Sequence, residues 1–329
     1  MPPVPSPTAT AARRPPREDG LARHRFRILS ALSVALAAVG CAPPGPRVPE
    51  SATEAFRQTL AASPANPYPI SYLRAGTPSG PRLVLVHGTP GSANAWADYL
   101  MDVPPGWEVV ALDRPGFGRS GPEVAVVGLA EQAAAVAALI PADGRPVVLL
   151  GHSLGGPVIA RVAADHPGRI AALVMLAASL DPELEEIHPM QYVGAWAPVR
   201  SLLPRVLRNA NAELLALKSE LQLLAPMLRG ITTRVVIVHG TLDDLVPVAN
   251  VGFMQSHFGA SKCVTTVLLE GRNHFLPWNS AASVRDAVRL ALELDAPDLL
   301  VTAIHACPRR FNIDHLCRLN FDQGLELSF

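Results

Sequence analysis

The chain has 329 residues, of which 49% are hydrophobic, 17% charged and 5% aromatic. This length and apolar content can fill the core of one large α/β domain or two small ones, and they exclude disorder of the whole chain. Twenty-eight basic side chains balance 28 acidic ones, so there is no broad basic surface and we predict no nucleic acid partner.

The first 41 residues have the pattern of a targeting signal. Residues 1–20 lack apolar periodicity, and we predict either disorder or a start codon assigned too far upstream. In residues 21–41, three arginines precede an uncharged apolar run at 28–40. Thirteen residues rise only about 20 Å as a helix, which is short of the hydrocarbon core of a bilayer. The segment therefore predicts a secretory signal peptide. The alternatives are an amphipathic or transmembrane anchor, or a chance apolar stretch.

Ala38-Val39-Gly40-Cys41 ends this segment and resembles the lipobox of bacterial lipoproteins, although Ala38 stands where Leu is usual. The resemblance implies that Cys41 is lipidated and becomes the mature N-terminus. We then expect residues 42–66 to be a tether, and the protein to be exported and anchored in a membrane facing the periplasm or cell exterior.

Short apolar runs alternate with Ala-rich helical patterns over residues 67–180 and 230–295. This alternation predicts a mostly parallel sheet with helices on both faces, which is an α/β fold. The predicted strands are 70–73, 82–87, 108–113, 147–152, 172–178, 234–239 and 264–269, and the predicted helices are 93–100, 129–139, 154–166, 248–258 and 281–294.

Residues 181–229 interrupt the alternation and contain no strand pattern. Leu214, Leu217, Leu221 and Leu224 recur there at helical spacing. We predict a small helical lid over the carboxyl edge of the sheet, where ligands of such folds bind. Its leucines favour either an apolar substrate or ordinary helix packing.

Gly151-His152-Ser153-Leu154-Gly155-Gly156 joins the strand 147–152 to the next helix. Small residues on both sides of a serine allow a sharp strand-to-helix turn from which the serine protrudes. A serine hydroxyl needs a nearby base, itself oriented by a carboxylate. Asp243 and His274 each follow a predicted strand, so they share the sheet edge with Ser153. The three side chains predict a nucleophile, acid and base, although a glycine turn, a helix cap and a surface histidine are the plain alternatives.

His87-Gly88-Thr89-Pro90-Gly91-Ser92 follows the strand 82–87. Attack on a carbonyl creates an oxyanion, which two backbone N–H groups can stabilise. Thr89 and Leu154 are the candidate donors. Pro90 has no N–H, which favours Thr89.

Residues 68–295 resemble α/β-hydrolase fold proteins. The matching segments are HGTPGS at 87–92, LDRPGFGRS at 112–120, GHSLGG at 151–156, HGTLDDLVP at 239–247 and GRNHFLPW at 271–278, in the order of the family. The resemblance implies Ser153 as nucleophile, Asp243 as acid and His274 as base. It assigns Asp113 to a structural turn. Asp244 and Asp181 are the alternative acids, and the spacing from Gly240 to Val246-Pro247 favours Asp243.

Serine at the turn argues against dehalogenases and most epoxide hydrolases, which carry aspartate there. We predict a serine hydrolase acting on a small-molecule carboxylic ester, with no cofactor and no metal site. Amides, thioesters and C–C bonds are alternative substrates, and a non-catalytic binding protein of this fold is a further alternative. The natural substrate, the oligomeric state and the role of the C-terminal extension 296–329 are not predicted.

Overall fold

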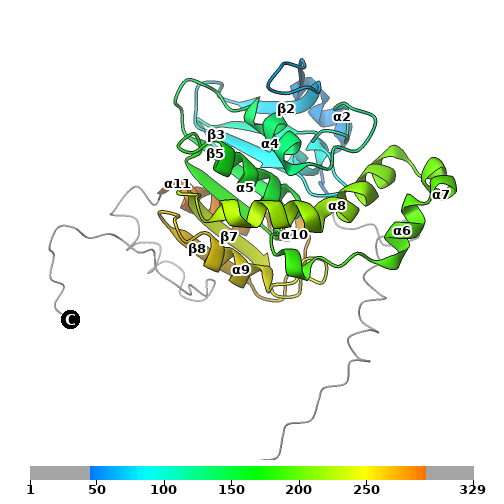
Figure 1. The fold of residues 1–329 in the computed structure, drawn as a ribbon. Coiled ribbons are helices and arrows are strands. Elements are labelled where there is room, and N and C mark those ends of the chain that lie inside the picture. Colours follow the sequence, from blue (N-terminus) through cyan, green and yellow to red (C-terminus); the bar gives the residue numbers. More distant parts are fainter. Residues whose placement is uncertain (1–44, 294–329) are drawn as a thin grey trace, which may run out of the picture. The chain divides into compact units, whose positions relative to one another are not determined.

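The computed structural model of the protein describes residues 45–293. These residues form a sheet with the order β1-β2-β4-β3-β5-β6-β7-β8 (Figure 1). Strands β1–β2 and β2–β4 pair antiparallel, and all other neighbours are parallel. The strands are β1 (Arg57–Leu60), β2 (Ile70–Gly76), β3 (Arg82–Val86), β4 (Glu108–Leu112), β5 (Val147–His152), β6 (Ala172–Leu176), β7 (Arg234–Gly240) and β8 (Val264–Leu269).

Helices cover both faces of this sheet. Val84 and Val86 of β3 point to one face, and Leu83 and Leu85 point to the other, because side chains alternate along a strand. The first face packs against α4 (Leu129–Ala137), α5 (Gly155–Asp165), α8 (Arg205–Leu228) and α9 (Asn250–His257). The second packs against η2 (Ala93–Trp96), α3 (Ala97–Leu100) and α11 (Ala281–Glu293). The predicted α/β fold class is therefore confirmed.

The segment between residues 45 and 66 differs from the predicted tether. It contains α2 (Glu50–Thr53), η1 (Glu54–Phe56) and β1. Strand β1 adds to the edge of the sheet by pairing with β2. The guanidinium of Arg57 lies 3.0 Å from the buried Asp113 carboxylate. The prediction of a tether is wrong for residues 50–60, because strand pairing and this ion pair hold them on the core.

The lid lies between β6 and β7, as predicted. It comprises η3 (Pro182–Leu184), α6 (Pro189–Ala195), α7 (Ala197–Leu202) and α8. Leu217, Leu221 and Leu224 of α8 are buried in the main core. Of the two alternatives for the leucine stripe, the structure therefore favours helix packing. Helices α6 and α7 lie beyond the N-terminal end of α8, away from the sheet (Figure 1).

Between residues 45 and 293, no helix combines the length and apolar character needed to cross a bilayer. The predicted signal peptide, Cys41 and the extension 296–329 lie outside the described residues.

Candidate active site

Ser153 occupies a strained turn between β5 and α5. Its φ angle is +55°, a left-handed conformation that non-glycine residues rarely adopt. The turn is held by a hydrogen bond of 3.0 Å from Ser153 N to Leu176 O of β6. Helix α5 begins very close to β3, since a Cβ at Gly155 would lie 2.4 Å from Val86 O. The small residues after Ser153 thus permit a turn that exposes the half-buried serine at the sheet edge.

His274 and Asp243 form a buried hydrogen-bonded pair. The distance from His274 Nδ1 to Asp243 Oδ2 is 2.8 Å, and the Asp243 side chain is fully buried. Asp243 Oδ1 accepts hydrogen bonds from the backbone N–H groups of Leu245 and Val246, at 3.0 and 2.8 Å. Because Asp243 Oδ2 accepts the hydrogen bond from His274 Nδ1, the proton of the neutral imidazole lies on Nδ1. His274 Nε2 is then the unprotonated, basic nitrogen.

His152 links the turn at Ser153 to His274. It precedes Ser153, and its ring centroid lies 4.7 Å from that of His274. Burial lowers the pKa of His152 to about 3, so the imidazole is neutral near pH 7. Its Nε2–H donates to His274 O at 3.0 Å. Ser153 Oγ itself forms no hydrogen bond with another described group, as is common before substrate binds.

His239 packs beside the loop that carries Asp243. Its Nε2 lies 2.9 Å from Val246 O and 3.5 Å from Asp243 Oδ2. Burial lowers the pKa of His239 below its ordinary value. The neutral ring therefore donates to the Val246 carbonyl and helps to fix the loop that carries Asp243.

The loop 87–92 lies against Ser153. A Cβ at Gly88 would lie 2.8 Å from Ser153 Cβ and 3.3 Å from Ser153 Oγ, so only glycine fits without displacement. Within the described chain, the backbone N–H groups of Thr89 and Leu154 donate to no other protein group. These two predicted donors are thus available to an oxyanion formed at Ser153.

Arg114 fixes the position of this loop. Its Nε donates to His87 O at 2.9 Å, and its Nη2 donates to Gly88 O at 3.0 Å. Its two terminal nitrogens also pair with the Glu213 carboxylate of α8, at 2.6 and 3.0 Å. Burial and the Arg114 charge hold the pKa of His87 well below its usual value. The neutral His87 accepts from Arg114 N at 3.0 Å.

The other aspartates considered from the sequence lie in different surroundings. The Asp113 carboxylate accepts from Ala93 N at 2.7 Å and from Arg119 N at 3.0 Å, as a structural turn requires. Asp244 is exposed. Asp181 caps η3 by accepting from Glu183 N. The hydrogen bond to His274 therefore distinguishes Asp243 from all three.

An open cavity of about 730 Å³ borders the loop 87–92. It is lined by Pro90 and Gly91 of that loop, by Phe117 and Trp278, and by Pro204–Val206 at the start of α8. Most of these side chains are apolar. The cavity is thus suited to the apolar part of a ligand whose reacting group lies near Ser153.

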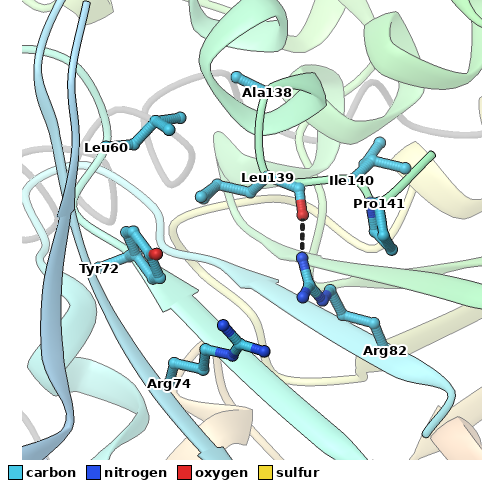
Figure 2. Close-up of a pocket in the computed structure, with 8 residues that line it drawn as sticks. All are labelled: Leu60, Tyr72, Arg74, Arg82, Ala138, Leu139, Ile140 and Pro141. Carbon is cyan, nitrogen blue, oxygen red and sulfur yellow. Dashed lines mark hydrogen bonds between the residues drawn. The ribbon is translucent and has the colours of Figure 1, made fainter. Parts of the chain in front are cut away.

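A second, smaller cavity is lined by residues of β1, β2, β3 and the segment that follows α4 (Figure 2). It measures about 140 Å³ and includes Arg82, the first residue of β3, and Arg74 near the end of the antiparallel β2. Both guanidinium groups pair with the buried Glu108 carboxylate. Since β3 begins here, this cavity is separate from the carboxyl edge where Ser153 lies.

Comparisons with known proteins agree with this fold. A family model described as alpha/beta hydrolase fold matches residues 81–200. The chain is 29% identical over 234 residues to the pimeloyl-[acyl-carrier protein] methyl ester esterase of Aeromonas hydrophila subsp. hydrophila, covering 59% of this chain and 89% of that one. It is 40% identical over 104 residues to lipase LipV of Mycobacterium tuberculosis, covering 30% of this chain and 38% of the lipase.

The fold also matches solved structures. A carboxylesterase structure from the Thaumarchaeon Nitrososphaera gargenis has a TM-score of 0.57 at 18% identity, covering 73% of this chain and 100% of that one. The sheet, its helices and these matches define an α/β-hydrolase fold. With esterases and lipases among its relatives, the protein is an α/β-fold hydrolase.

Proposed function

We propose that the protein is a serine esterase that uses Ser153, His274 and Asp243. The hydrogen bond of 2.8 Å between His274 and the buried Asp243 carries this proposal. The left-handed turn at Ser153 and the two unpaired N–H groups beside it support it. Relatives described as a methyl ester esterase and a lipase favour an ester over an amide, a thioester or a C–C bond. A complete set of catalytic groups argues against the non-catalytic alternative.

The proposed reaction has two steps. Ser153 Oγ bonds to the carbonyl carbon while His274 Nε2 takes the hydroxyl proton, and the N–H groups of Thr89 and Leu154 bind the oxyanion. The C–O bond to the alcohol then breaks, and His274 returns the proton to the departing oxygen. Water next attacks the acyl carbon and gives a proton to His274. The bond from this carbon to Ser153 Oγ then breaks, and His274 returns the proton to Oγ, which releases the acid and the free serine. Asp243 stabilises the imidazolium in both steps.

Labelling with a fluorophosphonate probe tests this function directly. We expect one label per chain, located on Ser153, together with hydrolysis of p-nitrophenyl esters. The Ser153→Ala variant should lose both, because the probe needs an activated serine. A chain that hydrolyses esters equally well after this substitution would contradict the proposal. A labelled chain that cleaves no ester of any acyl length would point to an amide, thioester or C–C substrate.

The close approach of Gly88 to Ser153 gives a second prediction. Gly88→Ala places a methyl group against the nucleophile, and we expect kcat to fall about 100-fold because the loop or the serine must shift. Gly252→Ala is the matched control, since a Cβ there contacts nothing within 4 Å. Kinetics on p-nitrophenyl butyrate would compare the two variants. Equal rates in both would show that the close approach does not constrain the site.

We also propose that the protein is exported and lipidated at Cys41. The Arg-flanked apolar run at 28–40 and the lipobox-like segment ending at Cys41 support this proposal. Labelled palmitate should be incorporated into the wild type and lost in Cys41→Ser. Incorporation that survives the substitution would exclude Cys41 as the modified residue.

A further inference from the structure

The lid carries a dense group of exposed apolar side chains. Among the described residues, fourteen large apolar side chains are exposed, and seven of them lie within residues 190–207. We call these seven the lid apolar surface: Met190, Tyr192, Val193, Trp196, Leu202, Val206 and Leu207. Trp196 is 64% exposed and Tyr192 is 61% exposed. Such a concentration of apolar area on one segment indicates a surface that contacts another apolar phase.

No residue of α6 or α7 is buried, so these helices contribute nothing to the core. One polar contact joins α6 to α8, where Asn211 Nδ2 donates to Gln191 O at 2.9 Å. Trp196 directly follows α6, and its backbone N–H donates to Tyr192 O at 3.1 Å. Packing of these helices against the core therefore does not account for the exposure of Tyr192 and Trp196.

The same segment is basic. Residues 187–212 contain three arginines, at positions 200, 205 and 208, and no aspartate or glutamate. Arg200 is exposed. Arg205 and Arg208 also bind the segment 118–123, where Arg205 pairs with the Glu123 carboxylate at 3.4 Å. Apolar and aromatic side chains flanked by arginines match the interface of an anionic bilayer, where rings lie at headgroup level.

The N-terminal end of the described chain lies beside this surface. Gly45 and Pro46 line the same cavity as Pro204–Val206. The next two residues are fixed by the Asp98 carboxylate, which accepts from Arg47 N and from Val48 N, each at 3.0 Å. The first described residues therefore lie beside the start of α8, which carries Val206 of the lid apolar surface.

We propose that the lid apolar surface docks on an anionic phospholipid bilayer, with Trp196 and Tyr192 in the headgroup region. A second copy of the chain is a poorer occupant, because it would bring the exposed Arg200 side chains, which have like charge, towards each other. The cavity beside the loop 87–92 shares Pro204–Val206 with this region. An amphiphilic ester could thus pass from the bilayer towards Ser153, a consequence that rests on the proposed function.

Fluorescence quenching by lipids tests the docking. The full chain is mixed with vesicles of phosphatidylcholine and phosphatidylglycerol that contain brominated acyl chains. The contribution of Trp196 is the difference between the wild type and Trp196→Phe. We expect this contribution to be quenched on anionic vesicles, and less so on pure phosphatidylcholine or at high salt.

Leu223 provides a matched control position. It is also 64% exposed and lies on α8, about 24 Å along the helix from Leu207. A tryptophan introduced by Leu223→Trp in the Trp196→Phe chain should remain unquenched. Vesicle-bound chain in which Trp196 is unquenched would overturn the proposal, as would equal quenching at both positions. Self-association through Trp196 without vesicles would also overturn it, in favour of a second copy. Hydrolysis of a soluble ester is measured on the same samples, so failure of docking is distinguished from failure of the proposed activity.

Discussion

The Asp243→Asn variant is expected to hydrolyse esters about 10⁴-fold more slowly than the wild type, with its fold unchanged. Asp243 Oδ1 accepts from two backbone N–H groups, and the retained amide oxygen of asparagine can keep both bonds. The amide nitrogen then faces His274 Nδ1, where the carboxylate oxygen stood at 2.8 Å. Because an N–H group cannot accept a proton, the His274 proton moves to Nε2. The base that Ser153 requires is then absent.

Steady-state kinetics on a p-nitrophenyl ester would measure this effect, with circular dichroism to compare the folds. Asp244→Asn is the control, since Asp244 is the exposed neighbour in the same loop. We expect its kcat to stay close to that of the wild type. A large loss of activity in Asp244→Asn, with little change in Asp243→Asn, would show that the acid is Asp244 and that the assignment of Asp243 is wrong.

Much of the fold could be predicted because the central strands are continuous apolar runs. Residues 83–86 and 147–150 are buried on both faces of the sheet, and such runs are readable without knowledge of their partners. Strand β1 has the sequence Arg-Gln-Thr-Leu and no such run. Its place depends on pairing with β2 and on the contact of Arg57 with Asp113, 56 residues away. Neither contact leaves a local pattern in the sequence.

The same distinction applies to the site. The places of Ser153, Asp243 and His274 after strands β5, β7 and β8 could be predicted because each follows a recognisable strand, and the sheet brings strand ends together. The side chains that support these three residues could not be predicted from the sequence. His152 and His239 act through contacts with His274 O and Val246 O, and Arg114 acts through a partner 99 residues away. Only the position of His152 next to Ser153 could have drawn attention to it.

The pair of Arg114 and Glu213 joins the lid to the loop 87–92 and gives the second large prediction. Both side chains are almost fully buried, at 0% and 2% exposed. Glu213→Ala leaves the guanidinium charge without its partner in a region that water cannot reach. We expect the free energy of unfolding to fall by about 3–5 kcal/mol, as measured by urea denaturation. Asp165→Ala is the control, because it removes the partly exposed pair with Arg161 and should cost less than about 1 kcal/mol.

A double substitution separates stability from catalysis at this pair. Arg114→Met with Glu213→Leu removes both charges and should recover most of the stability lost in Glu213→Ala, because apolar side chains can replace a buried ion pair. Its kcat should remain low, since Met donates no hydrogen bond to His87 O or Gly88 O and the loop beside Ser153 is no longer fixed. If the double variant recovers full activity, Arg114 supports only the fold. If Glu213→Ala is no less stable than Asp165→Ala, the pair does not hold the lid to the core.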